Sequence, residues 1–356
     1  MEGVDIYPHY ATFADPHTVR VGDELIEGET IVINAGGRPR EIALPGIEVV
    51  NWLNNVRILE LEELPPHLII VGGSYISLEF GQAFRRLGSE VTILEAGPQL
   101  IFREDADIAE KVQEILEDEG VTVHLGAHVK RLAQEGDEKI AVFFEQDGQP
   151  RQVRGTHLLL AVGRRPNSDR LNLEAAGVEV DEQGYIAVND IMQTNVPHIF
   201  AVGDINGEGA FTHTAVNDGE IFWDTYSGED DRRLGDRIVT YALFTDPPLG
   251  RVGMSAKEAL ASGRNVLMGT MPMRAIARAR EKGETAGMVK ILVDGDTEEF
   301  LGVAILGIGG DEIVNMFTPF MYTGKSYKLF RKAVLTHPTV AELMPWVLYR
   351  LRPLEE

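Results

Sequence analysis

Leu68-Ile69-Ile70-Val71-Gly72-Gly73-Ser74-Tyr75-Ile76-Ser77-Leu78-Glu79-Phe80 is the stretch around which the chain is organised. It joins an apolar run, a turn of small residues and the amphipathic start of a helix without a spacer. This order is typical of a buried parallel strand that leads directly into a helix. The N-terminus of such a helix can hold a phosphate, because its first amide groups have no partner within the helix.

A second apolar run, Val91-Thr92-Ile93-Leu94, ends in Glu95, which lies 23 positions after Gly72. In dinucleotide-binding βαβ units, about 20 residues separate the glycine turn from the acid that holds the adenosine ribose. We therefore predict a βαβ nucleotide-binding unit. A carboxylate at this point would repel a 2′-phosphate, and Ala96 and Gly97 offer no cation. NADH is consequently favoured over NADPH.

The glycine turn matches the GxGxxG pattern only partly. Its three glycine positions are occupied by Gly72, Ser74 and Ser77. Serine is small enough at both later positions, and the Ser74 hydroxyl could donate to a phosphate. An ordinary turn between a strand and a helix is the alternative interpretation of this stretch.

Composition narrows the class of protein. A length of 356 residues predicts two or three domains. A net charge of −23 argues against nucleic acid or an anionic membrane as a partner. The chain has no cysteine, so it can form neither a disulfide nor a zinc–thiolate site. No apolar stretch is long enough to span a membrane, and the N-terminus lacks the features of a secretory signal, so we expect a cytoplasmic location.

Strand and helix patterns alternate between Pro65 and Pro166. We predict helices over 75–87 and 105–119, strands over 68–71, 90–94, 121–124 and 158–163, and a hairpin that pairs 140–145 with 152–155 across a five-residue connection. The flanking segments are β-rich, and the last 120 residues form a separate α/β pattern that includes a helix over 311–322. A strand over 199–204 ends in Asp204, which by itself could be a helix N-cap. Overall the pattern predicts the α/β class.

Several motifs, taken together and in this order, resemble the pyridine nucleotide–disulfide oxidoreductases, in particular their mercuric-reductase-like and reactive-chlorine-resistance-type branch. Besides the glycine turn, they are Ile33-Asn34-Ala35-Gly36-Gly37-Arg38-Pro39, Ala161-Val162-Gly163-Arg164-Arg165-Pro166-Asn167, Ala201-Val202-Gly203-Asp204, Phe211-Thr212-His213-Thr214-Ala215, Pro247-Pro248-Leu249-Gly250-Arg251-Val252-Gly253-Met254, and His337-Pro338-Thr339 followed by Glu342. The resemblance covers essentially the whole chain.

The resemblance implies a partial FAD domain over 1–50 and 167–233, interrupted by a Rossmann-like NAD domain over 51–166 and followed by an α/β dimerisation domain over 234–356. It implies a homodimer. NAD would be held by Gly72, Ser74, Tyr75, Ile76, Ser77 and Glu95, with Gly163 bordering the pocket. Tyr75 would screen the flavin on its nicotinamide side, with Glu79 nearby. FAD would be held by Asp204 at the ribityl chain and by the helix start His213, Thr214 and Ala215. Gly36 would be a further cofactor-binding residue.

The resemblance also implies a reaction, in which NADH transfers a hydride to FAD and FAD reduces a disulfide or a metal ion. His337 would be the acid/base, oriented by Glu342 and reaching the partner subunit's active site. Without the family, His337 would be a loop histidine before a proline. The turn Gly307-Ile308-Gly309-Gly310 looks like another nucleotide turn, but we expect a packing turn there.

The sequence departs from the family in one respect. The FAD-binding Rossmann unit and the Cys-x4-Cys redox pair that open the family's chain have no counterpart here. We therefore expect an N-terminally truncated form of the enzyme. The alternative is an NADH-binding dimeric module with a vestigial flavin site and no disulfide reductase activity. The electron acceptor is left open, and mercuric reduction is not expected, because the C-terminus lacks a cysteine pair.

Overall fold

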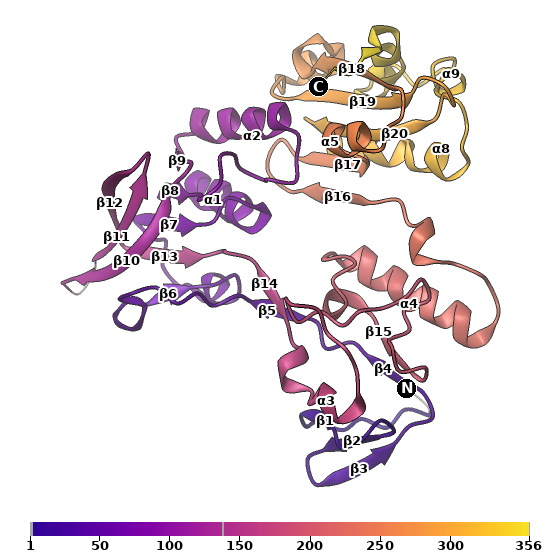
Figure 1. The fold of residues 1–356 in the computed structure, drawn as a ribbon. Coiled ribbons are helices and arrows are strands. Elements are labelled where there is room, and N and C mark those ends of the chain that lie inside the picture. Colours follow the sequence, from indigo (N-terminus) through magenta and orange to yellow (C-terminus); the bar gives the residue numbers. More distant parts are fainter. Residues whose placement is uncertain (1–2, 137–138, 356) are drawn as a thin grey trace. The chain divides into compact units, whose positions relative to one another are not determined.

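The computed structural model describes residues 3–136 and 139–355 (Figure 1). The chain divides into two compact units, each built from two separate segments. Unit 1 comprises Met1–Arg40 and Gly163–Arg237, and unit 2 comprises Glu41–Val162 and Ile238–Glu356. The domain boundaries at 50, 166 and 233 stay predictions.

Among its described residues, unit 1 contains three small sheets. Strands β1 (Ala11–Phe13), β2 (Thr18–Val21) and β3 (Glu24–Glu27) form an antiparallel meander. Strand β4 (Ile31–Ile33) pairs in parallel with β15 (Ile199–Ala201), and β5 (Gly37–Pro39) pairs antiparallel with β14 (Arg164–Pro166). The helices are α3 (Leu173–Ala176) and α4 (Thr212–Ser227). The predicted strand over 199–204 is shorter than expected, because Gly203 has a φ of 75° and starts a 3-10 turn over Gly203–Ile205.

Unit 2 contains the predicted βαβ unit. Its parallel sheet has the order β6 (Trp52–Leu53), β13 (His157–Leu160), β7 (His67–Val71), β8 (Glu90–Leu94), β9 (Thr122–His124). Helices α1 (Tyr75–Leu87) and α2 (Ala106–Asp118) pack on one face of this sheet. The side chains of β7 are buried on both faces, as expected for an inner parallel strand. The predicted helix over 75–87 is confirmed.

A second sheet covers the other face of the parallel sheet. It consists of β10 (His128–Glu135), β11 (Lys139–Gln146) and β12 (Gln149–Gly155). The predicted hairpin is present, but its five-residue connection is wrong. Asp147 and Gly148, with φ of 53° and 71°, make a two-residue turn, and positive φ at both positions matches the twist of a tight hairpin.

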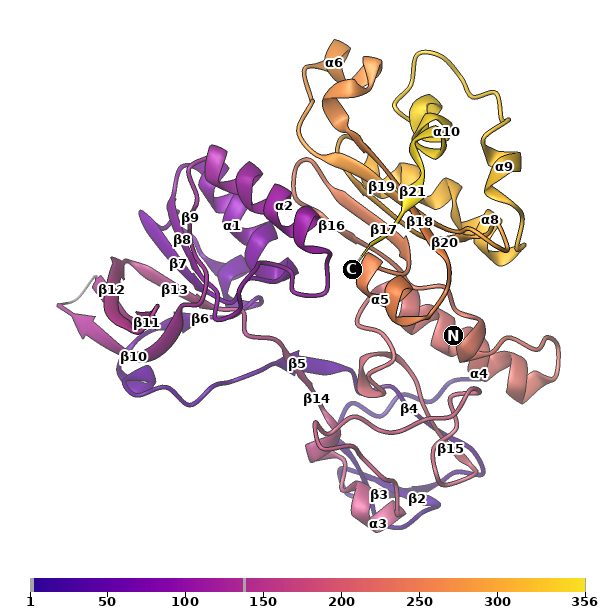
Figure 2. The same cartoon turned by 45° about the horizontal axis from the view of Figure 1, so that its top comes forward.

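The last part of unit 2 is an antiparallel sheet with helices (Figure 2). Its strand order is β16 (Thr240–Leu243), β17 (Leu249–Gly253), β20 (Phe300–Leu306), β19 (Met288–Asp294), β18 (Val266–Pro272), β21 (Arg352–Pro353). The helices are α5 (Ala256–Ala261), α6 (Ala277–Lys282), α7 (Gly310–Ile313), α8 (Thr318–Tyr322), α9 (Tyr327–Phe330) and α10 (Met344–Val347). The single helix predicted over 311–322 is therefore wrong: a 3-10 turn separates α7 from α8, which has Pro319 in its first turn.

The turn at Gly307–Gly310 serves packing, as expected. A Cβ atom on Gly250 in β17 would overlap the carbonyl oxygen of Gly310, so the strand and the start of α7 lie in backbone contact. The βαβ unit and the last part of the chain also share one hydrophobic core, in which Leu243 and Leu249 pack with Leu68 and Ile93. Unit 2 is thus a single packed body.

Candidate nucleotide-binding site

Two consecutive glycines allow the turn after β7. Gly72 has a φ of 111°, and a Cβ atom there would overlap the carbonyl oxygen of Ala161 at the end of β13. A Cβ atom on Gly73 would lie 2.7 Å from Oε2 of Glu95. The turn therefore requires glycine at both positions, and it brings the backbone against the Glu95 carboxylate.

The first turn of α1 offers amide donors. Ser74 is the N-cap residue, but its side chain makes no capping hydrogen bond, and the first bond within the helix runs from the amide of Leu78 to the Ser74 carbonyl. Ser77 is buried, and in the part of the chain that the structure describes its hydroxyl has no hydrogen-bond partner. The positive end of this 13-residue helix, whose first turn has no side-chain cap, fits a phosphate.

Glu95 follows directly on β8. Its amide donates to the His124 carbonyl, and its Oε1 accepts from the amide of Gly97 at 2.5 Å. Strand β7 lies between β8 and β13, so the direction of strand succession reverses beside the glycine turn. Ligands of open α/β sheets bind at this point, outside the carboxyl ends of the strands. The donors and the carboxylate therefore fit a dinucleotide.

Tyr75 and Glu79 lie on α1 and face the last part of the chain. The ring of Tyr75 stands edge-on to that of Tyr241, with centroids 5.7 Å apart. Burial, and then the charge of Glu104, raises the pKa of Tyr75 to about 12. Oε1 of Glu79 accepts from the amide of Phe244 at 2.9 Å, and burial raises the pKa of this carboxyl above its usual value.

A buried ionic cluster lies next to this site, and the motifs in the sequence do not predict it. Arg251 on β17 donates to both carboxylate oxygens of Glu104, and Lys290 on β19 donates to Asp105 at 3.0 Å. The side chains of these four residues are at most 6% exposed. Burial lowers the pKa of Arg251, but the charge and the hydrogen bond of Glu104 outweigh it and raise the pKa. A charged residue within an otherwise apolar strand is the signal that could have revealed the cluster.

Asp204, the predicted ribityl ligand, lies in unit 1 in the 3-10 turn after β15. Its carboxylate is 3.6 Å from the Arg164 guanidinium. Gly163, with a φ of 101°, accepts the amide of Arg40, and Gly36, with a φ of 64°, accepts the amide of Asn167. Gly36 therefore lies beside the pairing of β5 with β14.

Buried Asp218 organises the turn that carries Asp204. Its Oδ2 accepts from the Gly203 amide and from Nδ2 of Asn206, each at 2.8 Å, and its Oδ1 is paired with Arg237. At the start of the same helix, α4, the Thr214 hydroxyl donates to the Phe211 carbonyl. The methyl group of Ala215 would be 3.5 Å from a Cβ on Gly203. Asp218 thus connects α4, which carries His213, to the turn that carries Asp204.

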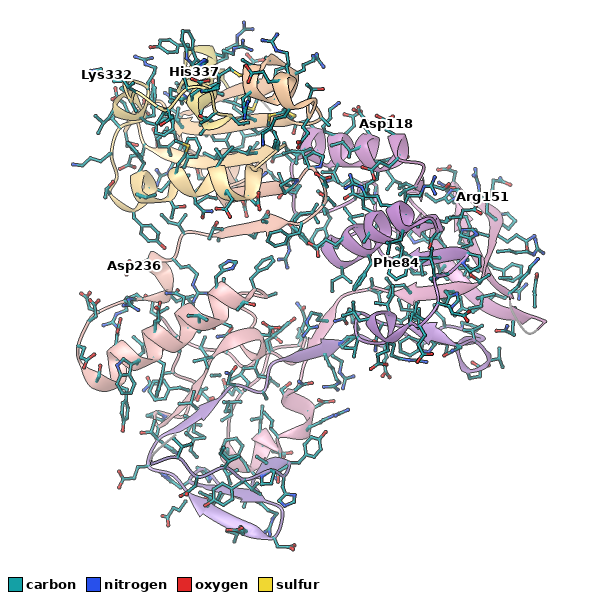
Figure 3. All side chains as sticks on the ribbon, turned by 180° about the vertical axis from the view of Figure 1, so that it is seen from behind. Phe84, Asp118, Arg151, Asp236, Lys332 and His337 are labelled. Atoms are coloured by element: carbon teal, nitrogen blue, oxygen red, sulfur yellow. The ribbon has the colours of Figure 1, made fainter. Side chains whose placement is uncertain are left out.

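His337, which is labelled in Figure 3, forms a pair with Glu342 in the last part of the chain. Nδ1 of His337 is 2.9 Å from both carboxylate oxygens of Glu342. The histidine side chain is 74% exposed, whereas that of Glu342 is 14% exposed. The contact expected between the two residues is present, and their catalytic role stays a prediction.

The described residues contain neither a metal cluster nor a membrane-spanning helix. No group of three or more histidine, cysteine, aspartate or glutamate side chains could hold a metal ion within 3–136 and 139–355. Over the same residues, no helix combines the length and the apolar character that crossing a membrane requires.

The chain belongs to the pyridine nucleotide-disulphide oxidoreductase family. The family's sequence profile matches residues 1–219, and the profile of its dimerisation domain matches residues 239–348. Members of this family are oxidoreductases, flavoproteins that bind FAD and NAD(P)H. The expected family, α/β architecture and cofactors are confirmed at this level.

Three relatives show the range of the family. The chain is 37% identical over 348 residues to the probable pyridine nucleotide-disulfide oxidoreductase RclA of Escherichia coli, covering 96% of this chain and 78% of RclA. It is 31% identical to the dihydrolipoyl dehydrogenase of Haloferax volcanii, covering 96% of this chain and 73% of that enzyme. Identity to the mercuric reductase of Staphylococcus aureus is 29%, and the chain spans 62% of that enzyme's length.

Solved structures agree with the sequence comparison. The HOCl-induced flavoprotein disulfide reductase RclA from Escherichia coli superimposes with a TM-score of 0.86 over 94% of this chain and 77% of its own. Its Cu(II) complex superimposes with a TM-score of 0.89 over 96% of this chain and 78% of its own. Sequence identity is 37% in both cases.

Proposed function

We propose that the turn between β7 and α1 binds NADH, in an FAD-dependent oxidoreductase that passes the electrons to a disulfide or a metal ion. The observation that carries the proposal is the Glu95 carboxylate beside Gly73, next to the uncapped start of α1. Glu95 would accept hydrogen bonds from the adenosine ribose, and the amides of Tyr75, Ile76 and Ser77 would receive the pyrophosphate.

The preference for NADH follows from charge. A 2′-phosphate would approach the Glu95 carboxylate, and the following residues, Ala96 and Gly97, carry no positive charge to compensate. When bound, NADH supplies a hydride and FAD accepts it. On the side of unit 1, Asp204 and the start of α4 from His213 to Ala215 would hold FAD, with Gly36 and Gly163 bordering the cofactor sites.

His337 would serve as the acid/base in a homodimer. Because Nδ1 faces the Glu342 carboxylate, the hydrogen bond between them fixes the ring, and Nε2 is left to take up or release a proton. For the acceptor, the Cu(II) complexes of RclA support a metal ion, and the naming of RclA as a disulfide reductase supports a disulfide.

The test is a titration of the purified chain with NADH and with NADPH, followed by nicotinamide fluorescence. We expect tighter binding of NADH. Glu95→Gln should raise the Kd for NADH by about tenfold, because a hydrogen bond to a charged group contributes about 1.5–3 kcal/mol. The same variant should bring the affinities for NADH and NADPH closer together. The matched control is Glu110→Gln, an exposed position on α2. Equal affinity of the two variants for NADH would contradict the proposal.

A second candidate is an NADH-binding dimeric module without disulfide reductase activity. The absence of cysteine from the sequence favours it, because no redox disulfide can form within these residues. The visible spectrum of the same samples distinguishes the two candidates. Flavin absorbance that remains with the protein after gel filtration supports the flavoenzyme, and a colourless protein that binds NADH supports the module.

A further inference from the structure

One face of α1 is fastened along its length to the segment 241–246. Positions 75, 79, 82 and 86 lie on the same side of the helix, because they are spaced by four, three and four residues. Tyr75 contacts the ring of Tyr241, and Glu79 accepts the amide of Phe244.

The other end of this face is also held by polar contacts. Gln82 donates to the carbonyl of Asp246 at 2.8 Å and accepts the Asp246 amide at 2.7 Å. Arg86 forms an ion pair with the Asp246 carboxylate at 2.5 Å. The helix whose first turn is the proposed phosphate site is therefore anchored to the connection between β16 and β17.

At the nucleotide end, the anchor continues into the buried ionic cluster. The Tyr241 hydroxyl donates to Oε1 of Glu104 at 2.7 Å, and Glu104 is held by Arg251. The Glu104 side chain is fully buried, so water does not compete for its hydrogen bonds. The ion pair between Glu104 and Arg251 thus holds the Tyr241 hydroxyl in place. The Tyr241 ring in turn packs against Tyr75, the first residue of α1.

The loop that carries Glu104 reaches the glycine turn by a second route. The Glu104 amide donates to the carbonyl of Ile101 at 2.7 Å, and the Ile101 amide donates to the carbonyl of Gly73 at 2.8 Å. Both sides of the turn between β7 and α1 are therefore connected to Glu104.

We propose that Tyr241 is a positioning residue for nucleotide binding: held by Glu104 and Arg251, it fixes Tyr75 and with it the amides that would receive the pyrophosphate. The inference rests on the proposed NADH site and extends the determinants of that site to the last part of the chain. A turn that is already ordered binds more tightly, because less conformational freedom is lost on binding.

The test compares Tyr241→Phe with Asp246→Asn in the full chain. Tyr241→Phe keeps the ring against Tyr75 and removes the hydroxyl that is hydrogen-bonded to Glu104 and to Tyr75. Asp246→Asn weakens the far end of the same helix face and leaves both backbone bonds to Gln82. We measure the Kd for NADH and for ADP-ribose, a probe with the pyrophosphate and no nicotinamide, together with the melting temperature.

Tyr241→Phe should raise both Kd values by the same factor, about threefold to tenfold, and Asp246→Asn should leave both within about twofold. A purely structural role would lower the melting temperature without changing either affinity. Unchanged affinity in Tyr241→Phe, a loss confined to NADH, or an equal loss in Asp246→Asn would overturn the inference. A wild-type chain that binds neither ligand would instead overturn the proposed function.

Discussion

At the scale of single residues, Glu79 is a carboxylate whose burial destabilises the folded protein when the group is charged. It is half-buried on α1, and it accepts a hydrogen bond from the neutral amide of Phe244. Burial disfavours the charged form, so the pKa of Glu79 is raised in the folded protein. The folded state then binds the proton more tightly than the unfolded state does.

The sign of the pH effect follows from this difference. Below the unfolded pKa, Glu79 is protonated in both states and carries no penalty; as the pH rises from about 4.5 through the raised folded pKa, this group lowers the free energy of unfolding. Glu79→Gln keeps an oxygen for the Phe244 amide and removes the charge. We expect it to raise the melting temperature at pH 7 and to leave it unchanged at pH 4.

The control for this measurement is Glu110→Gln, which replaces an exposed glutamate on α2. It should not alter the dependence of stability on pH. If Glu79→Gln were less stable than the unaltered chain at pH 7, the ionised carboxylate would be stabilising the fold, against our expectation.

At the scale of elements, the contact between β17 and α7 depends on the absence of a side chain. A Cβ atom on Gly250 would meet the carbonyl oxygen of Gly310 and, at 2.8 Å, the side chain of Val314. By contrast, Gly219 lies within α4 with open space where its Cβ would be. The fold therefore has no room for a side chain at Gly250, whereas it has room for one at Gly219.

Alanine substitutions should therefore have opposite effects. Gly250→Ala forces backbone apart and should lower the free energy of unfolding by about 1–3 kcal/mol. Gly219→Ala should raise it by up to about 1 kcal/mol, because alanine is the better helix former. Chemical denaturation of both variants measures the two changes. Destabilisation by Gly219→Ala would show that this face of α4 is covered.

The difference between local and long-range contacts explains which parts of the fold the sequence could predict. The βαβ unit follows from local signals: the apolar residues of β7 are contiguous, and α1 is followed by the C-cap residue Gly88, which has a φ of 115°. Strand β10 gives no such signal, because only Leu132 of its eight residues is buried. Arg251 and Glu104 are 147 positions apart, so no local pattern relates them. The same holds for Tyr241, whose role depends on a contact rather than on a motif.

At the scale of the whole molecule, the dimerisation profile over 239–348 supports a homodimer. Val334, 98% exposed, and Trp346, 60% exposed, are apolar side chains within that range. Apolar side chains that are exposed in one copy gain free energy when a second copy covers them. We infer that they contribute to the contact between two copies.

Sedimentation should show a species of twice the 39.3 kDa chain mass. Val334→Asp should shift it toward the monomer, and Val216→Asp, at a 58% exposed valine on α4, should not. Because each copy carries a charge of −23, added salt should strengthen the association by screening repulsion. A monomer at all salt concentrations would contradict the inference.

The division of each unit into two segments has a consequence for biosynthesis. Strand β4 pairs with β15, so Ile31 meets its partner Ile199 only after 168 further residues have been made. At about 5–20 residues per second, the ribosome takes roughly 8–34 seconds to supply them. Arg38 likewise cannot donate its hydrogen bond to Asp169 until that residue has been made. During this interval strand β4 lacks its parallel partner, so its apolar side chains cannot yet be buried against β15.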